Sequence, residues 1–452
     1  MRKDYEGYKP TGIAWIPQIP EHWNWSFLSQ VASEQKIKKP KDKILPVMSL
    51  SYGQIIRKKN IDAGLVPASY DNYQLISKGN IILRFTDLQN DHTSLRTGLV
   101  KEDGIITSAY TNIQPKINSV FLAYLLHSYD TMKVFYGMGS GVRQSIGFKD
   151  VRYLQIPVPP RKEQDQIVRF LDWKVSIINK LINIKQKEIE VLEEQRVALI
   201  SQATHCGILK PSKLKESGFA WMGDIPVNWH IRRFSKVAVV RAKIVSPQEH
   251  LEDMQISPAS IEKGSGRILY TQTVKEAGVV GNNHRFYRGQ IIYSKIRPLL
   301  NKVAIAPFDG LCSTDMYPIE TSLETRYLKY FMLSQNFLCQ LSMTGDRVKM
   351  PRLNQVELAS VFIAFPEDKK EQKEIADYLD KVCERIQASI ECTKLYIAML
   401  RELSARLIAD AVTGKIDVRN ITVPEYEHAD EVSADGGEDE SEESEDFNKE
   451  ED

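Results

Sequence analysis

Two stretches of this chain gather side chains of the kind that contact nucleic acids. Arg, Lys, Asn and Gln carry donors and acceptors that fit the edges of base pairs, and Arg, Lys and hydroxyl groups bind phosphates. The candidates in the first stretch are Arg57, Lys58, Lys59, Arg84, Arg96, Arg143, Gln144 and Lys149. The candidates in the second are Arg241, Lys243, Asn283, Arg285, Lys295, Arg297, Arg347, Lys349 and Arg352. A single residue of this kind is more often a solvated surface charge than a base contact, so the hypothesis of DNA binding rests on the two clusters together.

Some of these candidates lie in a loop that occurs twice. Gly141-Val-Arg143-Gln-Ser and Gly345-Asp-Arg347-Val-Lys349 stand at similar places before the last expected strand of each stretch. A basic loop hinged by glycine can approach a duplex closely. The recurrence favours Arg143 and Arg347 as DNA contacts.

The sequence indicates no catalytic centre. It has no Gly-x-x-x-x-Gly-Lys-Ser/Thr phosphate loop, and its eight histidines do not pair with Cys, Asp or Glu at a metal-ligand spacing. We interpret His205-Cys206 as structural. Glu367-Asp-Lys369 loosely resembles a nuclease cluster of acids and a lysine, but it lies in the link to a long helix. We therefore expect no catalytic residue, no metal site and no cofactor bound by this chain.

The small net charge of +1 hides an uneven distribution. Residues 430–452 contain 13 Asp or Glu and one Lys, so residues 1–429 hold 59 Lys and Arg against 46 Asp and Glu. A basic body favours a polyanion as partner. The acidic end is either a solvated solubility segment or a competitor of nucleic acid for the basic body.

The sequence favours a cytoplasmic protein. It has five cysteines, an odd number with no Cys-x-x-Cys pair, which indicates a reduced chain. We find no apolar run long enough for a bilayer and no signal-peptide core after Met1, and we expect no membrane contact.

Two long helices are predicted by apolar residues that alternate in steps of four and three, the seam of a coiled coil. Adding 208 to each seam position of the first helix gives the seam of the second. The first seam is Ile167, Leu171, Val175, Ile178, Ile182, Ile189, Leu192, Leu199 and Ala203. The second is Ile375, Leu379, Cys383, Ile386, Ile390, Ile397, Leu400, Leu407 and Ala411. Polar residues interrupt both at the same places, Lys185 and Arg196 in one and Thr393 and Ser404 in the other. We expect the two stripes to bury each other.

The duplication extends to the segment before each basic stretch. Gly12-Ile-Ala-Trp15…Ile19-Pro20…Trp23 returns as Gly218-Phe-Ala-Trp221…Ile225-Pro226…Trp229. We expect each lead-in to pack as an apolar clasp against a long helix. The stretches that follow read as strand-rich with short helices.

This layout resembles the specificity subunit of type I restriction-modification systems. The resemblance covers the chain to about residue 418 and rests on the two Trp…Ile-Pro…Trp lead-ins. It also rests on Pro157-Val-Pro-Pro160…Glu163-Gln164 and Pro366…Glu371-Gln372 before the long helices, and on Tyr293-Ser-Lys-Ile-Arg297-Pro298. The acidic end is not part of the family pattern.

The resemblance implies an α+β fold in which two similar strand-rich α/β target recognition domains are separated by two long antiparallel coiled-coil helices, with an internal pseudo-two-fold repeat. The bounds we expect are 1–160 for the first recognition domain with its lead-in at 8–32, 161–206 for the first helix, 207–366 for the second recognition domain with its lead-in at 214–238, 367–414 for the second helix and 415–452 for an acidic, disordered tail.

The resemblance further implies that each domain reads half of an asymmetric two-part DNA target, while the helices fix the gap and dock two modification subunits. Those methyltransferase subunits would carry S-adenosylmethionine, and restriction subunits would use ATP and Mg²⁺ for translocation and cleavage in a prokaryotic cytoplasm. The alternative is a non-enzymatic coiled-coil scaffold that reads no sequence.

Overall fold

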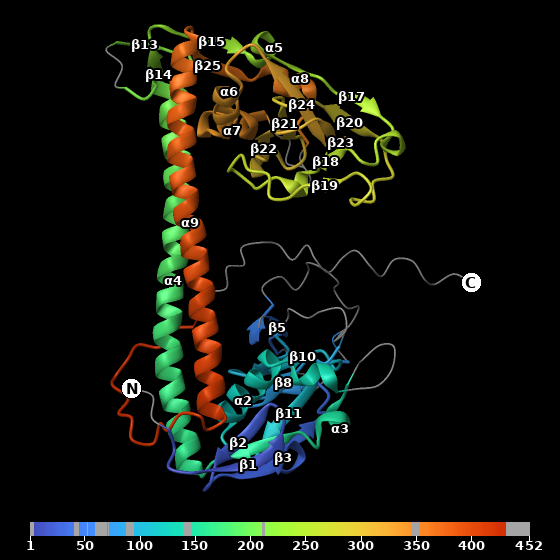
Figure 1. Ribbon diagram of the computed structural model, residues 1–452, viewed down its shortest axis with the longest axis vertical. Coiled ribbons are helices and arrows are strands. Elements are labelled where there is room, and N and C mark those ends of the chain that lie inside the picture. The colour runs from blue at the N-terminus through green and yellow to red at the C-terminus, as the bar shows by residue number, and fades with distance from the viewer. Residues whose placement is uncertain are drawn as a thin grey trace, which may run out of the picture. The chain divides into compact units, whose positions relative to one another are not determined.

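The computed structural model describes residues 4–39, 45–51, 53–58, 70, 72–86, 95–138, 146–209, 213–344 and 352–430. It divides into two compact units, the first comprising Met1–Gln186 and Leu395–Asp452 and the second Lys187–Lys394. Each long helix runs through both units. The first recognition domain belongs to unit 1 and the second to unit 2 (Figure 1).

The first domain is built on an antiparallel four-stranded sheet of order β4-β11-β8-β9, with helix α2 beside it. The Asn118 side chain caps α2 by accepting bonds from the backbone N–H groups of Val120 and Phe121. The apolar face of α2, with Phe121 and Leu125 fully buried, forms the core together with the sheet. The elements are β1 (Tyr8–Ile13), β2 (Ile16–Pro20), β3 (Asn24–Phe27), α1 (Leu28–Val31), β4 (Ala32–Gln35), β5 (Met48–Ser51), β6 (Gln54–Arg57), β7 (Gln74–Ile76), β8 (Ile81–Leu83), β9 (Thr97–Leu99), β10 (Gly104–Ile106), β11 (Thr111–Pro115), α2 (Ser119–Thr131), η1 (Val134–Gly137), α3 (Phe148–Val151) and β12 (Gln155–Val158).

The second domain repeats this sheet and has a second sheet of five strands, whose counterparts in the first domain are the strand pairs β5-β6 and β7-β10. Its four-stranded sheet has the order β16-β24-β21-β22, which matches the first domain strand for strand, and α6 replaces α2. The five-stranded sheet has the order β17-β20-β23-β18-β19 and its own core, and in the first domain isolated bridges from Val47 to Ile105 and from Lys38 to Gln74 connect the corresponding strands. The elements are β13 (Leu214–Glu216), β14 (Asp224–Pro226), β15 (Trp229–Arg233), α5 (Phe234–Val237), β16 (Ala238–Val240), β17 (Lys243–Val245), η2 (Pro247–Glu249), β18 (Met254–Ile256), η3 (Pro258–Ser260), β19 (Gln272–Thr273), β20 (Asn283–Phe286), β21 (Ile291–Ser294), η4 (Pro298–Leu300), β22 (Val303–Ile305), β23 (Gly310–Ser313), β24 (Met316–Thr321), α6 (Thr325–Leu333), α7 (Gln335–Thr344), α8 (Gln355–Ser360) and β25 (Phe362–Pro366).

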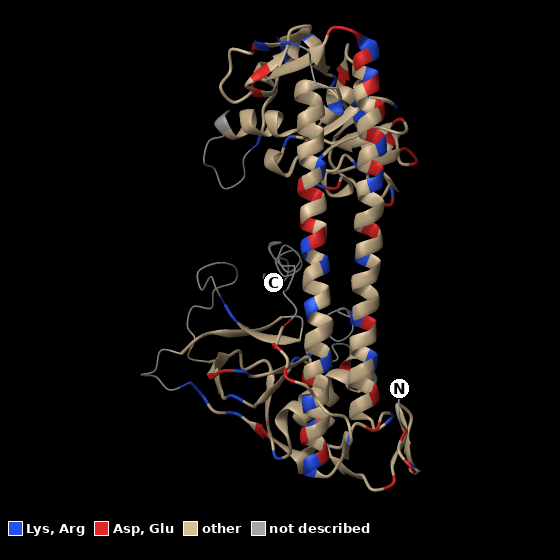
Figure 2. Cartoon of the chain, turned by 90° about the vertical axis from the view of Figure 1, so that its left-hand side faces the viewer, with Lys and Arg blue, Asp and Glu red and all other residues tan. Residues whose placement is uncertain are grey.

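The two long helices are α4 (Arg161–Cys206) and α9 (Lys369–Val412), which lie side by side in Figure 1. Their outer faces carry charges of both signs, as Figure 2 shows. Most predicted seam residues are buried: Ile167, Leu171, Ile178, Ile182, Ala203, Ile375, Leu379, Ile386, Ile390, Ile397, Leu400 and Ala411. The α+β class and the paired helices are therefore as predicted.

The seam differs from the prediction near the end of each helix. Leu199 and Leu407 are only half-buried, whereas the next residues, Ile200 and Ile408, are 1% and 5% exposed. Ile189 and Leu192 are half-buried as well. A straight α-helix drifts by about 20° per seven residues relative to a strict heptad seam, so the buried position moves by one residue. The shift occurs beyond Arg196 and Ser404, where polar residues already interrupt both seams.

The duplicated Glu-Gln pair attaches each domain to the start of a helix. Glu163 accepts the indole N–H of the buried Trp23 at 3.0 Å, and Gln164 accepts the backbone N–H of Asn118 at 3.0 Å. In unit 2, Glu371 accepts the indole N–H of Trp229 at 2.9 Å.

The rest of the duplicated motif completes these contacts. In unit 2, Gln372 accepts the backbone N–H of Glu324 at 2.9 Å. The repeated Leu-Asp supplies the carboxylates of Asp172 and Asp380, which accept the hydroxyl groups of Tyr124 and Tyr330 at 2.8 and 2.7 Å. The motif therefore joins lead-in, domain helix and long helix in each unit.

Each tryptophan also packs against the end of the other helix. Gly414, beyond α9, has a φ of +76°, and any side chain there would collide with Pro20 in the first lead-in. Gly207, beyond α4, has a φ of +80° and faces the ring of Trp229. The first domain thus holds the start of α4 and the end of α9, and the second holds the end of α4 and the start of α9.

The prediction of a disordered tail from residue 415 is wrong for its first part. Residues 415–430 are described, and Gln166 on α4 donates to the backbone carbonyls of Val418 and Ile421 at 3.1 and 2.7 Å. Val418 is fully buried, and the hydrogen bonds from α4 satisfy backbone carbonyls of this segment. Residues 431–452 lie outside the described residues.

Candidate nucleic-acid interface

The candidates of the first domain separate into exposed and buried residues. Arg57, Lys58 and Lys149 are exposed, and Arg84 is half-buried. Arg57 donates from Nε to Glu102 at 2.6 Å, and this guanidinium lowers the pKa of the carboxyl group. Because solvent screens an exposed ion pair strongly, Arg57 could exchange Glu102 for a phosphate at little cost. Lys59, Arg143 and Gln144 lie outside the described residues.

The prediction that Arg96 contacts DNA is wrong. Its side chain is fully buried, its Nη1 donates to the backbone carbonyl of Thr86, and its guanidinium lies 5.6 Å from the ring centre of Tyr136. A buried guanidinium needs such partners because desolvating a charge is costly. Arg96 therefore stabilises the first domain from within.

In the second domain, strand β17 brings basic residues to the edge of the five-stranded sheet. Lys243 is exposed and lies opposite Arg285 of β20 in the strand register. Arg285 donates to Asp253 at 3.2 Å and lies 3.1 Å from Nδ1 of His250. Arg241, just before β17, donates to Glu320 at 2.8 Å and, with Gln290, lowers the pKa of that carboxyl group.

Asn283 is another candidate that the structure overturns. It is 2% exposed, and its amide donates to the backbone carbonyl of Gly281 at 2.9 Å. Asn283 and Arg285 lie two positions apart on β20 and so share one face of the strand, but Asn283 is buried there whereas Arg285 is half-buried. Asn283 in this arrangement shapes the start of β20 and cannot reach a base.

Three further candidates come together at what we call the basic corner, formed by Lys295, Arg297 and Arg352. The backbone N–H of Leu353 bonds the carbonyl of Lys295 at 2.8 Å, and Ile296 forms an isolated bridge with Arg352. Arg352 is exposed, and the Lys295 ammonium lies 5.4 Å from the ring centre of Tyr317. Residues more than fifty positions apart in the sequence thus meet at one place.

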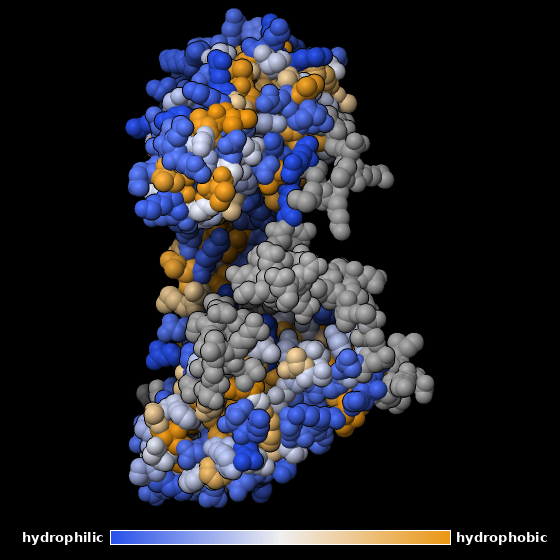
Figure 3. Space-filling view, turned by 90° about the vertical axis from the view of Figure 1, so that its right-hand side faces the viewer, coloured by the Kyte–Doolittle hydropathy of each residue, from blue (hydrophilic) through white to orange (hydrophobic). Residues whose placement is uncertain are grey.

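The backbone of the basic corner is strained. Arg297 has a φ of +45° and Asn301 a φ of +48°, the left-handed region that non-glycine residues rarely adopt. Between them, helix η4 exposes Leu299 and Leu300. Apolar side chains also gather in patches among hydrophilic ones on the face of the second domain in Figure 3. Strain of this kind is maintained by the surrounding fold and is concentrated at functional sites. Arg347 and Lys349, the loop candidates of the second domain, lie outside the described residues.

The basic corner also affects a buried histidine. Burial lowers the pKa of His284 on β20, and the neighbouring Lys295 lowers it further. Both effects favour the neutral imidazole, because a second positive charge there would be poorly solvated and repelled. The corner keeps its positive charge on exposed or half-buried residues.

Two lysines of the first domain are absent from the predicted set. Lys101 lies in the loop between β9 and β10, next to the Glu102 that binds Arg57. Lys78 donates its backbone N–H to the carboxylate of Asp103 in the same loop at 2.8 Å. These lysines come close to Arg57 only in the fold, so the sequence does not group them. The sequence does indicate a turn at Lys78, because Gly79 follows it.

Within the described ranges, no group of three or more His, Cys, Asp or Glu side chains is placed to hold a metal ion. Across the same ranges, no helix is long and apolar enough to cross a membrane. The arrangement as described offers surface cations and strained loops for binding.

The model of the type I restriction modification DNA specificity domain matches this chain twice, over residues 20–194 and 226–393. The specificity subunit of the Escherichia coli type I restriction enzyme EcoDI is 29% identical over 315 residues, which cover 66% of this chain and 70% of that protein. The specificity subunit of the Methanocaldococcus jannaschii enzyme MjaVIII is 22% identical over 338 residues, covering 70% of this chain and 76% of that one.

A solved structure shows the same fold. A chain from a study of complex assembly and conformational transition in the type I R-M system aligns with a TM-score of 0.60 at 15% identity, covering 87% of this chain and 98% of that chain. The duplicated sheets, the paired helices and the double match of the family model agree with one another.

Proposed function

This chain belongs to the family of type I restriction-modification specificity subunits, and on that premise we propose that each of its two domains reads one half of a two-part DNA sequence. The subunit itself is non-catalytic, and its partner is double-stranded DNA. Each domain contacts its own half-site through exposed cations and adjacent loops.

One observation supports this proposal above the others: the same attachment carries two different surfaces. Trp23 and Glu163 attach the first domain just as Trp229 and Glu371 attach the second. The four-stranded sheets match, but the described residues that the two domains expose differ, as at the basic corner of the second domain. A shared scaffold with different surfaces suits two readers of different half-sites.

The long helices, in this proposal, set the gap between the half-sites. Two readers joined by a stiff spacer bind one duplex only when the half-sites are separated to match. The helices have 46 and 44 residues, and both are continuous. Their length, rather than either domain, would determine the number of base pairs between the half-sites.

We also propose that an exposed apolar stripe on the helices docks the modification subunits. In unit 1 the stripe consists of Ile177, Leu181 and Ile184 on α4 and Leu395, Met399 and Leu403 on α9, each at least 39% exposed. The spacing of three and four residues places each set along one side of its helix. Contiguous exposed apolar residues mark protein interfaces.

The chemistry would come from the partners. The modification subunits would bring S-adenosylmethionine and methylate adenine, and restriction subunits would bring ATP-dependent translocation and cleavage with Mg²⁺. We expect the assembly to work in a prokaryotic cytoplasm. This chain would supply the sequence preference and the spacing.

Footprinting of the complex with its modification subunits tests the proposal. A two-part protected sequence with a fixed gap is the expected result. A scaffold that does not read sequence, the alternative function, would protect no particular sequence. Methylation by this chain purified alone would show that it carries catalytic machinery and would contradict the proposal.

A further inference from the structure

The segment Val418–Asp430, which we call the C-terminal strap, is bound along α4 through its backbone. Ser176 donates to the carbonyl of Glu427 at 3.1 Å and accepts the N–H of Ala429 at 2.7 Å. Asn179 and Asn183 donate to the carbonyls of Ala429 and Asp430, both at 3.0 Å. These hydrogen bonds join α4 side chains to the backbone of the strap. They therefore determine the position of its last residue, Asp430.

The strap occupies a face of α4 that is separate from the other two surfaces of the helix. At about 100° per residue, Ser176, Asn179 and Asn183 project roughly 120° away from the apolar stripe of Ile177 and Leu181. The angle between these three residues and the buried seam of α4 is about the same. The strap therefore leaves both the helix pairing and the apolar stripe free.

The end of the strap reaches the first recognition domain. Asp430 pairs with Lys101 at 2.9 Å, and Glu427 pairs with Lys180 of α4 at 2.7 Å. Both pairs are exposed and weak on their own. The hydrogen bonds from α4 to the backbone thus position the strap, and the ion pair with Lys101 shows that the strap ends at the first recognition domain.

Asp430 ends beside candidate DNA contacts. The loop that holds Lys101 continues with Glu102, which binds Arg57, and Asp103, which binds the backbone of Lys78. Lys58 follows Arg57. We call this group of cations, Arg57, Lys58, Lys78 and Lys101, the first-domain corner; Glu102 and Asp103 offset only part of its charge. The corner remains cationic before the strap is counted.

The next residues of the chain are strongly acidic. Residues 431–452 contain 12 Asp or Glu and one Lys, and their covalent start is fixed at Asp430. We propose that the strap tethers this acidic segment at the first-domain corner, where it competes with DNA phosphates for the same cations. The inference builds on the proposed function, because it assumes that the corner binds DNA.

Tethering makes the competition effective. A linked segment faces its site at an effective concentration in the millimolar range, and it does so in every molecule. Its attraction to the cations is screened by salt, as is that of DNA. The acidic segment therefore weakens the binding of DNA most at low salt, where non-specific binding is strongest. This competition favours a DNA that provides base contacts in addition to its phosphates.

The test compares four versions of the chain, each assembled with its modification subunits. The first is the full chain, and the second stops after Asp430, which retains every described strap contact. The third keeps the acidic segment but releases the strap through the triple change Ser176→Ala, Asn179→Ala and Asn183→Ala. The fourth, Ser389→Ala on α9, is a control for removal of a helix hydroxyl group. Dissociation constants for unrelated duplex DNA and for the recognised sequence are measured at low and high salt.

The truncated chain is expected to bind unrelated DNA about tenfold more tightly at about 50 mM salt, with the gain vanishing near 300 mM. The strap-release variant should recover part of that gain, and Ser389→Ala none. An unchanged constant on truncation overturns the proposal. A gain on truncation with none on strap release overturns the role of the strap. If the full complex preferred no sequence, the proposed function would be refuted instead. The measurement on unrelated DNA does not depend on sequence preference, so the two failures can be told apart.

Discussion

Trp229 donates its indole N–H to Glu371 across 2.9 Å, and it does so at the junction of lead-in, recognition domain and long helix. Trp23 makes the equivalent bond to Glu163 across 3.0 Å. Both tryptophans are fully buried, so their N–H groups have no access to water as an alternative acceptor. These two bonds explain why Glu recurs at the start of both long helices.

Glu371→Ala should destabilise unit 2 by about 1–3 kcal/mol, because it leaves a buried indole N–H without an acceptor. Glu374→Ala, an exposed position on the same helix, is the matched control and should change stability by less than about 0.5 kcal/mol. Urea unfolding followed by tryptophan fluorescence measures both. Equal midpoints for the two variants would show that the bond contributes nothing.

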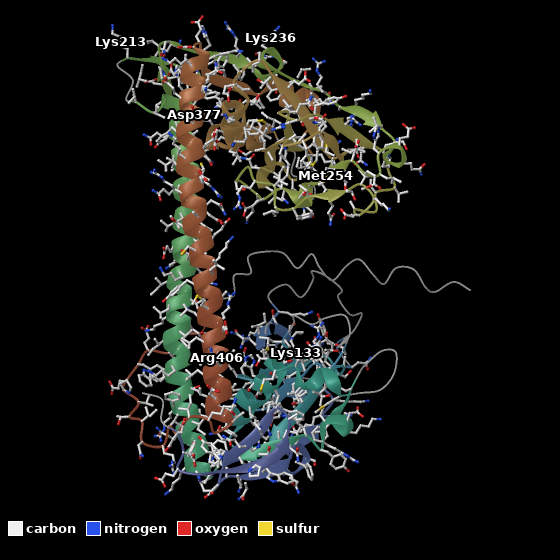
Figure 4. The ribbon with its side chains drawn as sticks, in the orientation of Figure 1. Lys133, Lys213, Lys236, Met254, Asp377 and Arg406 are labelled. Carbon is white, nitrogen blue, oxygen red and sulfur yellow. The ribbon has the colours of Figure 1, made fainter. Side chains whose placement is uncertain are left out.

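Changes at the basic corner should weaken DNA binding without unfolding the domain. Arg352→Ala or Lys295→Ala should cost about 1–3 kcal/mol if the residue contacts a base, and should then relax preference at one position of one half-site. A phosphate contact should instead weaken binding to all sequences and reduce the salt slope by about 0.9. Lys236→Ala, which changes an exposed side chain of α5 (Figure 4), is the control. If both corner variants kept the DNA affinity and the base preference of the native chain, the basic corner would not be part of the DNA interface.

Arg96→Met should affect stability rather than recognition. The change removes a buried guanidinium from the Thr86 carbonyl and the Tyr136 ring, so a loss of about 1–3 kcal/mol in unit 1 is expected. The bases preferred in either half-site should remain the same. Altered base preference with unchanged stability would return Arg96 to the set of DNA contacts.

The pKa of His284, lowered by burial and by Lys295, predicts acid sensitivity in unit 2. The unfolded chain binds a proton near pH 6.5 and the folded chain only at lower pH. Stability is therefore complete above pH 6.5 and falls as the pH drops through the folded pKa. Urea unfolding from pH 7.5 to 5 should show a steeper loss for the native chain than for His284→Gln. NMR titration should find a higher His284 pKa in Lys295→Ala; an unchanged pKa would exclude Lys295 as a cause.

The sequence predicted the elements better than the surfaces. Heptad spacing and the 208-residue offset identified α4 and α9, because burial of an apolar stripe is a local and repeated requirement. The Glu-Gln and Trp motifs were visible, but their mutual hydrogen bonds depend on the fold. Arg96 and Asn283 failed as DNA contacts because residue type does not reveal which way a loop or strand turns a side chain. The basic corner could not be predicted as a unit, since a backbone bridge joins Ile296 to Arg352.

Shortening both helices should shorten the gap in the DNA target. Removing the facing heptads 183–189 from α4 and 393–399 from α9 shortens the pair by about 10 Å, which corresponds to roughly three base pairs. Both half-sites should keep their bases, because neither domain is altered. A changed base in a half-site, or an unchanged gap in an intact complex, would contradict the role of the helices as a spacer.

Mapping methylated adenines in DNA modified by the native assembly tests the central proposal most directly. We predict one motif made of two different half-sites separated by a fixed number of unspecified base pairs. Exchange of the second recognition domain for that of a relative should change only one half. A single uninterrupted motif, or a change in both halves after the exchange, would contradict the assignment of one half-site to each domain.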